Sequence, residues 1–273
     1  MTVQRQKWLS AYLFLFFVCL ESPLLIIVLT SFSSDETVSF PPAGLSLRWY
    51  ADLWHQLWNQ GGVKPGLAMS LWTSVWLSVL SAAGATVAGV AAALGLRFFS
   101  SRSAGILKQY LLFPILFPQV VIGIGLLLWF SALGGMPVWT KLLLGHFILT
   151  MPYVVVTTSA SLEMLDPALE EAAMNLGANF VRTLGHVTLP MIRAGILSGA
   201  LFAWLTSFSN FTISFFLYSG ETRPAPVWIF EVLQFVIDPS LAALSTVLLL
   251  TTLVVLFSAN RILGIGRLVG LRR

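Results

Sequence analysis

The sequence has little charge, one cysteine and no nucleotide-binding loop, and each shortage excludes a class of protein. Only 10% of the 273 residues are charged, while 57% are hydrophobic. Soluble globular domains carry about 25% charged residues, so this composition excludes an ordinary soluble protein as well as a disordered one. The single cysteine, Cys19, permits no internal disulfide and no thiolate metal cluster. No Gly-x-x-x-x-Gly-Lys-Ser/Thr phosphate loop occurs, so any ATP hydrolysis would take place on another chain.

What the sequence has instead is long apolar segments, with a mean hydropathy of +0.87. A helix needs about 20 mostly apolar residues to cross roughly 30 Å of hydrocarbon. By this criterion we predict an all-α membrane protein, one transmembrane domain over residues 1–273. Its six spans lie at about 9–32, 67–96, 109–133, 142–162, 194–218 and 239–260.

The distribution of lysine and arginine predicts the orientation of these spans. If the N-terminus lies inside, eleven of the fifteen basic residues fall in cytoplasmic segments. The four on the outer side are Arg48, Lys64, Lys141 and Arg223. We therefore expect a multi-pass protein of the inner (plasma) membrane with both termini in the cytoplasm.

The segment 163–193 is the one long polar stretch on the predicted cytoplasmic side. Asp166 is a good N-cap and Pro167 suits the first helical position. Gly177 is placed to end this short helix in a left-handed conformation. A second short helix should follow, and Pro190 should start the fifth span. The first helix has a small apolar face suited to close docking, made of Leu169, Ala172, Ala173 and Leu176.

Within this segment, Glu171-Ala172-Ala173, Gly177, Val187 and Leu189-Pro190 follow a distinctive spacing. The pattern resembles the EAA loop of permease subunits of binding-protein-dependent ABC importers, with Val187 where isoleucine is usual. The segments 40–50 and 207–217 are similar to the second permease of spermidine/putrescine-type importers. The resemblance implies a type I ABC importer fold and an ATPase-coupling loop. The residues assigned to that loop are Glu170, Glu171, Ala172, Ala173, Gly177, Val187, Leu189 and Pro190.

The same resemblance implies the partners. They are a second homologous permease, two ATP-binding subunits and an extracytoplasmic substrate-binding protein, all acting in the lipid bilayer and without nucleic acid. ATP and magnesium would bind to the ATPase, and this chain itself would hold no cofactor, no metal and no catalytic residue. The implied function is import of a small polar solute, such as a polyamine, an opine or an amino-phosphonate-like compound. The implied mechanism is rigid-body movement of the coupling loop, which tilts spans two to six.

The fifth span contains an unusually polar stretch, residues 206–214. Ser207, Asn210 and Ser214 share one helical face at i, i+3 and i+7, and polar groups in lipid must face other helices or water. Two interpretations stay open: these residues line the translocation path, or they hold helices together by hydrogen bonds. Polyamine-type relatives often carry an acid near the position of Ser209. Its absence here argues against a strongly cationic substrate.

Other polar or aromatic positions carry weaker predictions. Ser46 should cap a short outer helix whose Tyr50, Trp54 and Trp58 form one stripe, for the lipid interface or for a partner. His146 and Pro152 should interrupt the fourth span, and a lone histidine there is more often a hydrogen-bonded structural group than a proton relay.

Two other classes of function compete with the importer interpretation. A nucleotide-independent secondary transporter or channel would be expected to show an inverted repeat or a chain of intramembrane charges, and the sequence shows neither. A membrane-embedded enzyme would need a cluster of catalytic groups at one depth of the bilayer, and none can be identified.

Overall fold

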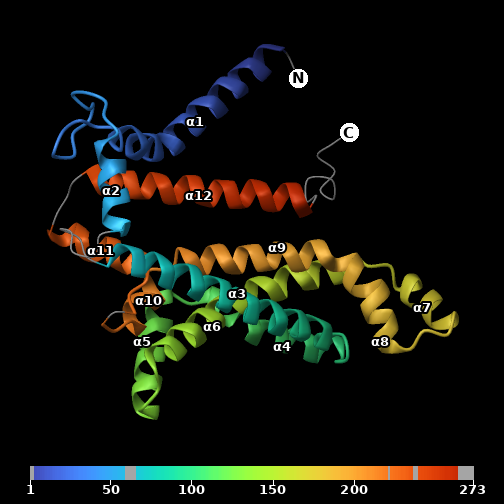
Figure 1. The fold of residues 1–273 in the computed structure, drawn as a ribbon. Coiled ribbons are helices and arrows are strands. Elements are labelled where there is room, and N and C mark those ends of the chain that lie inside the picture. Colours follow the sequence, from blue (N-terminus) through green and yellow to red (C-terminus); the bar gives the residue numbers. More distant parts are fainter. Residues whose placement is uncertain (1–2, 59–65, 221, 236–238, 264–273) are drawn as a thin grey trace. The chain divides into compact units, whose positions relative to one another are not determined.

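The computed structural model describes residues 3–58, 66–220, 222–235 and 239–263, and this part of the chain is almost entirely helical (Figure 1). The described residues form no β-strand, and their only bridge joins Ser33 to Leu45. The all-α prediction is therefore confirmed. The helices are α1 (Val3–Thr30), α2 (Arg48–Trp58), α3 (Leu67–Leu96), α4 (Ser101–Leu116), α5 (Gln119–Leu133), α6 (Val138–Glu163), α7 (Pro167–Asn175), α8 (Phe180–Thr183), the π-helical turn η1 (Leu184–Thr188), α9 (Leu189–Phe208), α10 (Thr212–Leu217), α11 (Ala225–Phe235) and α12 (Pro239–Leu263).

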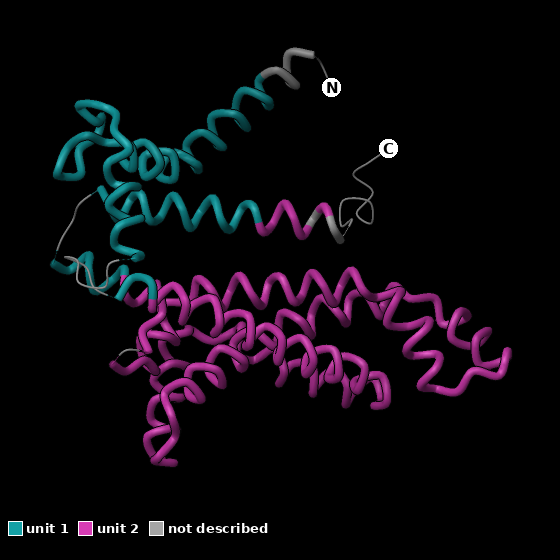
Figure 2. The backbone as a smooth tube through the Cα atoms, in the orientation of Figure 1, with its two compact units in different colours: residues 1–68, 229–254 teal, residues 69–228, 255–273 magenta. Residues whose placement is uncertain are grey.

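The chain divides into two compact units, where the sequence predicts a single domain (Figure 2). Unit 1 comprises residues 1–68 and 229–254, and contains α1, α2 and most of α11 and α12. Unit 2 comprises residues 69–228 and 255–273, and contains nearly all of α3 and the whole of α4 to α10. Both the 163–193 segment and the polar stretch 206–214 belong to unit 2.

Within the described ranges, five helical segments are long and apolar enough to cross a membrane. They are Trp8–Thr30, Leu67–Leu96, Val138–Glu163, Phe180–Phe208 and Pro239–Ala259, and the bent pair α4 and α5 makes a sixth if it counts as one span. His146 and Pro152 do not interrupt α6, which runs continuously through both. The prediction of an interruption there is wrong.

The third predicted span, 109–133, is not one helix. It is divided into α4 and α5, which meet at an angle of 99°. Phe117 is extended (φ −97°, ψ 147°) because the ring of Pro118 disfavours the helical conformation in the residue before it. Pro118 then precedes the first turn of α5, where its missing N–H costs no hydrogen bond.

The fifth predicted span, 194–218, is broken near its end and begins earlier than expected. The helix stops at Phe208 and restarts as α10 at Thr212. No proline or glycine causes this break. The Ile213 amide donates to the Asn210 side chain instead of to the backbone carbonyl of Ser209, so a polar side chain replaces a helical backbone bond at the break.

The core of unit 2 is built on the close packing of α6 against α9. Gly195, Gly199 and Ala203 recur at four-residue spacing on α9 and are all buried. Small residues at this spacing let two helix backbones approach closely. A Cβ on Gly199 would lie only 2.8 Å from the Cα of Val154 in α6, so glycine is required at this contact.

In unit 1, α2 is anchored at its first turn and exposed at its last. The Ser46 hydroxyl accepts from the Arg48 amide at 3.1 Å, which confirms the predicted cap. The Tyr50 hydroxyl shares a 2.6 Å hydrogen bond with Ser31. Trp54 and Trp58 remain 61% and 71% exposed, so only these two members of the aromatic stripe face outward.

Candidate functional site

Helix α7 carries the motif that the sequence singles out, and its two ends are formed by local signals. The Asp166 carboxylate accepts from the Ala168 amide at 3.0 Å, and Pro167 occupies the first helical position. At the other end Gly177 takes φ +89°, and the Ala178 amide donates to the Ala173 carbonyl at 3.1 Å. With the bond from the Gly177 amide to the Met174 carbonyl, this is a Schellman motif. Both predicted helix ends are confirmed.

The motif residues of α7 face in two directions. Glu171 and Ala172 are exposed, and Leu176 is 89% exposed, whereas Glu170 and Ala173 are half-buried. Consecutive residues of an α-helix point about 100° apart, so neighbouring acids can face different surroundings. In unit 2, α7 and α8 lie at the far end of α9 from α10 (Figure 1).

The sequence predicts a separate second helix followed by a new span, but the structure joins the two into one continuous helix. Helix α8, the turn η1 and α9 run without a break from Phe180 to Phe208, and Pro190 is the second residue of α9, near the predicted start of the fifth span. A proline in a helix removes one backbone donor and clashes with the carbonyl four residues earlier. The π-helical turn accommodates it: the Leu189 amide donates to the Leu184 carbonyl five residues back.

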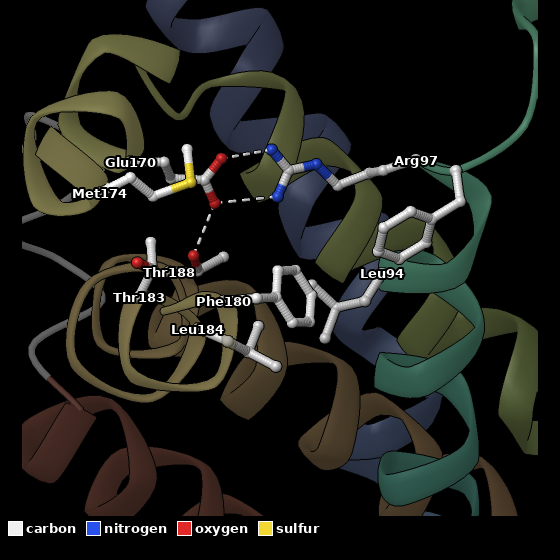
Figure 3. Close-up of a pocket in the computed structure, with 9 residues that line it drawn as sticks. Leu94, Arg97, Glu170, Met174, Phe180, Thr183, Leu184 and Thr188 are labelled. Carbon is white, nitrogen blue, oxygen red and sulfur yellow. Dashed lines mark hydrogen bonds and ion pairs between the residues drawn. The ribbon is translucent and has the colours of Figure 1, made fainter. Parts of the chain in front are cut away.

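A bidentate ion pair joins α7 to the end of α3. The Arg97 guanidinium donates to both carboxylate oxygens of Glu170, at 2.9 and 2.5 Å (Figure 3). The Thr188 hydroxyl donates to the same carboxylate at 2.6 Å. Arg97 therefore holds the pKa of the Glu170 carboxyl below its usual value, and Glu170 raises the pKa of Arg97. Both groups are charged at physiological pH.

A second polar cluster lies inside unit 2 and contains two of the predicted path residues. The His146 ring is fully buried, with Nδ1 2.8 Å from the Ser207 hydroxyl and Nε2 3.0 Å from the Ser214 hydroxyl. Ser214 also donates to the Asn210 carbonyl. Ser207 and Ser214 are thus buried within the chain's own core, and this placement favours the helix-packing interpretation for these two residues. It also agrees with a structural role for His146.

Asn210 lies elsewhere, at the break between α9 and α10. Its side-chain amide donates to the Gln119 side chain at 3.0 Å, and Gln119 is the first residue of α5. The two interrupted spans of unit 2 therefore meet at one pair of polar side chains. Irregular backbone at membrane depth is tolerated where it is buried in protein or lines a water-filled cavity.

Sequence reasoning missed three of the residues in these contacts: Arg97, Thr188 and Gln119. Arg97 is one of the eleven basic residues that the sequence places on the cytoplasmic side, and its partner Glu170 is 73 positions away. Pro118, directly before Gln119, is a visible signal for the break in the third span. Thr188 carries no local signal.

Comparison with known proteins agrees with the motif. The family described as the inner membrane component of binding-protein-dependent transport systems matches residues 84–265. The putrescine transport system permease protein PotI of Escherichia coli K12 is 32% identical over 261 residues, covering 90% of this chain and 87% of that protein. The spermidine/putrescine permease PotC of Haemophilus influenzae is 27% identical over 244 residues, covering 89% and 91% of the two chains.

The fold also matches solved transporters. A chain of a bacterial ABC transporter involved in import of the acidic polysaccharide alginate superposes with a TM-score of 0.71 at 15% identity, covering 96% of this chain and 98% of that one. An amino acid ABC transporter gives a TM-score of 0.52 at 16% identity, covering 72% and 91%.

The helices, the exposed α7 and these matches together define a multi-pass permease of the inner membrane type. The chain belongs to the family of binding-protein-dependent transport system inner membrane components. It is the transmembrane permease subunit of an ABC importer, and in this family separate ATPase subunits hydrolyse ATP. Family membership implies a permease partner, ATPase subunits and a binding protein.

Proposed function

We propose that this permease pairs with a second homologous permease, two ATPases and an extracytoplasmic binding protein, and that residues 163–193 form its ATPase-coupling loop on the cytoplasmic side. The observation that carries this proposal is α7 itself. It is a short helix with capped ends whose motif residues Glu171 and Ala172 are exposed, so a partner can reach them. ATP-driven movement of the ATPases would displace α7 and, through α6 and α9, tilt the spans.

Two substitutions test the coupling loop. Gly177→Val should disrupt the end of α7, because a β-branched residue does not readily adopt the positive φ found there. Glu171→Lys should reverse the charge that the exposed side of α7 presents to the ATPase. Both variants should insert normally in the membrane but lose the link between ATP hydrolysis and uptake. Wild-type uptake with normal substrate-stimulated ATPase in either variant would contradict the assignment.

For the substrate, we propose a small polar metabolite of the polyamine, opine or amino-phosphonate kind. Two relatives bear the names of putrescine and spermidine/putrescine permeases. Residues 206–214 contain no acid, so a cationic substrate would find no carboxylate in this stretch of the chain. Binding of putrescine, an opine and an aminophosphonate to the partner binding protein, measured by titration calorimetry, would decide among the three. If the binding protein binds none of the three compounds, the proposed substrate class is wrong.

For the translocation path, we propose Ser207, Asn210 and Ser214 as one polar region in which Asn210, with Gln119, contacts the solute. Ser207 and Ser214 would not contact the solute themselves but would hold this region in place through their hydrogen bonds to His146. The pair of amides at two helix breaks is the supporting feature, since discontinuous membrane helices commonly form transporter binding sites. Amide groups exchange hydrogen bonds readily with a polar solute or with water. Substituting Asn210 tests this role.

A further inference from the structure

The carboxylate of Glu170 is the point at which three elements of unit 2 meet. Glu170 lies in α7, and its carboxylate accepts hydrogen bonds from Arg97 at the end of α3 and from Thr188 in η1 (Figure 3). A guanidinium that donates to both oxygens of a carboxylate fixes the relative orientation of the two groups, as well as their distance. The third donor, from Thr188, restricts the carboxylate further.

The two adjacent acids of α7 therefore have separate surroundings. Glu170 is turned toward the permease, where its side chain is only 15% exposed, and Glu171 is turned outward. One side of α7 is thus held by the chain itself, while the other is open to a partner. The sequence assigns both acids to the coupling loop, but only Glu171 faces outward, so the inward-facing Glu170 needs a separate role.

Within the described part of the chain, helix α7 packs mainly on neighbouring elements of its own segment. It follows α6 in sequence and packs on α8 and η1. The ring of Phe180, at the start of α8, meets the ring of Phe98, next to Arg97, edge to face at 5.9 Å. The ion pair and this aromatic contact therefore connect the end of α3 to the α7–α8 region.

A cavity of about 230 Å³ is lined by the residues of these contacts. Its walls include Leu94, Met174 and Leu184. The Arg97 side chain is 42% exposed, and half-exposed ion pairs contribute little to global stability. Orientation, rather than stability, is what such a pair supplies.

We propose that Arg97 and Thr188 are positioning residues which hold the coupling helix α7 through Glu170, so that α3 moves together with α7. The inference rests on the proposed role of α7 in docking the ATPase. In this arrangement, force applied to the exposed side of α7 reaches α3 through the ion pair and α9 through η1. Loss of the pair would leave α7 formed and docked but poorly connected to α3.

The test uses the complete transporter, both permeases and both ATPases, reconstituted in proteoliposomes with its binding protein. Uptake, basal ATPase, ATPase stimulated by the loaded binding protein, and thermal stability are measured for Arg97→Gln, Glu170→Gln, the double variant and Thr188→Val. Arg97→Lys keeps the charge but loses the bidentate geometry. The matched control is Lys108→Gln, which removes another exposed ion pair of unit 2, Lys108 to Glu163 at 3.0 Å.

We expect Arg97→Gln to lower the uptake per ATP hydrolysed by about tenfold, because α3 no longer follows α7 and couplings between distant sites are usually of this size. Basal ATPase and thermal stability should stay near wild type. The double variant should be no worse than either single variant, because the two side chains act as one pair. Arg97→Lys should recover part of the loss, Thr188→Val should cause a smaller one, and Lys108→Gln should match wild type.

Three results would overturn the proposal. One is wild-type coupling in Arg97→Gln. Another is a loss of uptake in Arg97→Gln that is fully explained by a smaller amount of assembled complex. The third is additive loss in the double variant. If Glu171→Lys uncouples the transporter while Arg97→Gln does not, the coupling loop stands and only the positioning role fails. If the wild-type complex shows no ATP-driven uptake, the proposed function fails and this inference with it.

Discussion

The packing of α6 against α9 makes a quantitative prediction for Gly199→Ala. The new methyl group would lie 2.8 Å from the Cα of Val154 and 2.4 Å from the hydroxyl of Thr157. The hydroxyl can rotate away, but the Cα belongs to the backbone of α6. Ordinary contact begins near 3.4 Å, so the two helices would have to separate by roughly half an ångström along this contact.

Overpacking of this kind costs about 1–3 kcal/mol in a close-packed interior. The matched control is Gly95→Ala in α3, where an added Cβ meets nothing within 4 Å. There alanine should stabilise the helix by about 0.5–1 kcal/mol, because glycine loses more backbone entropy on folding. The same chemical change should therefore act in opposite directions at the two sites.

The assay compares thermal unfolding midpoints and ATP-driven uptake of the purified transporter with each variant. Because α6 and α9 flank the 163–193 segment on both sides, Gly199→Ala should also reduce uptake. Equal midpoints for Gly199→Ala and Gly95→Ala would refute the packing argument. If the midpoint falls while uptake stays unchanged, the close packing of α6 and α9 contributes to stability but not to the transmission of movement from the coupling loop.

Further predictions concern the polar clusters and the topology. His146→Leu should destabilise the complex by about 1 kcal/mol, since two membrane hydrogen bonds of about 0.6 kcal/mol each are lost; a thermal shift measures this, and an unchanged midpoint contradicts it. Asn210→Leu should reduce uptake without loss of assembly if Asn210 contacts the solute, and unchanged uptake with lowered stability would leave only a packing role. A cysteine at Leu176 should be labelled only from the cytoplasm and one at Leu45 only from outside, and labelling of both from one side would exclude the proposed topology. The lowered pKa of Glu170 means that its ion pair contributes above the ordinary carboxyl pKa and is lost as pH falls through the lowered value; the small stability difference between wild type and Glu170→Gln should be constant at neutral pH and vanish in acid.

The sequence by itself determined the features that depend on neighbouring residues. Apolar length predicted the membrane helices, and α3 begins and ends at the predicted residues 67 and 96. Asp166 and Gly177 predicted both ends of α7, because a cap is formed by a side chain or a φ angle within a few positions of the helix end. The EAA spacing indicated the family for the same reason, since it lies within twenty consecutive residues.

The tertiary structure decided which polar groups meet. Glu170 and Arg97 are 73 positions apart, and Asn210 and Gln119 are 91 apart. No local pattern selects such partners, because the pairing depends on how the helices cross. The serines assigned to the path show how far a local sequence pattern can predict the role of a residue. Their spacing predicts one polar face of a single helix, whereas the helix breaks between them, and only the packing of α6 beside α9 and α10 showed that Ser207 and Ser214 face His146. The break at Asn210 has the same origin, since side-chain hydrogen bonds replace backbone bonds there only because neighbouring helices satisfy the remaining polar groups.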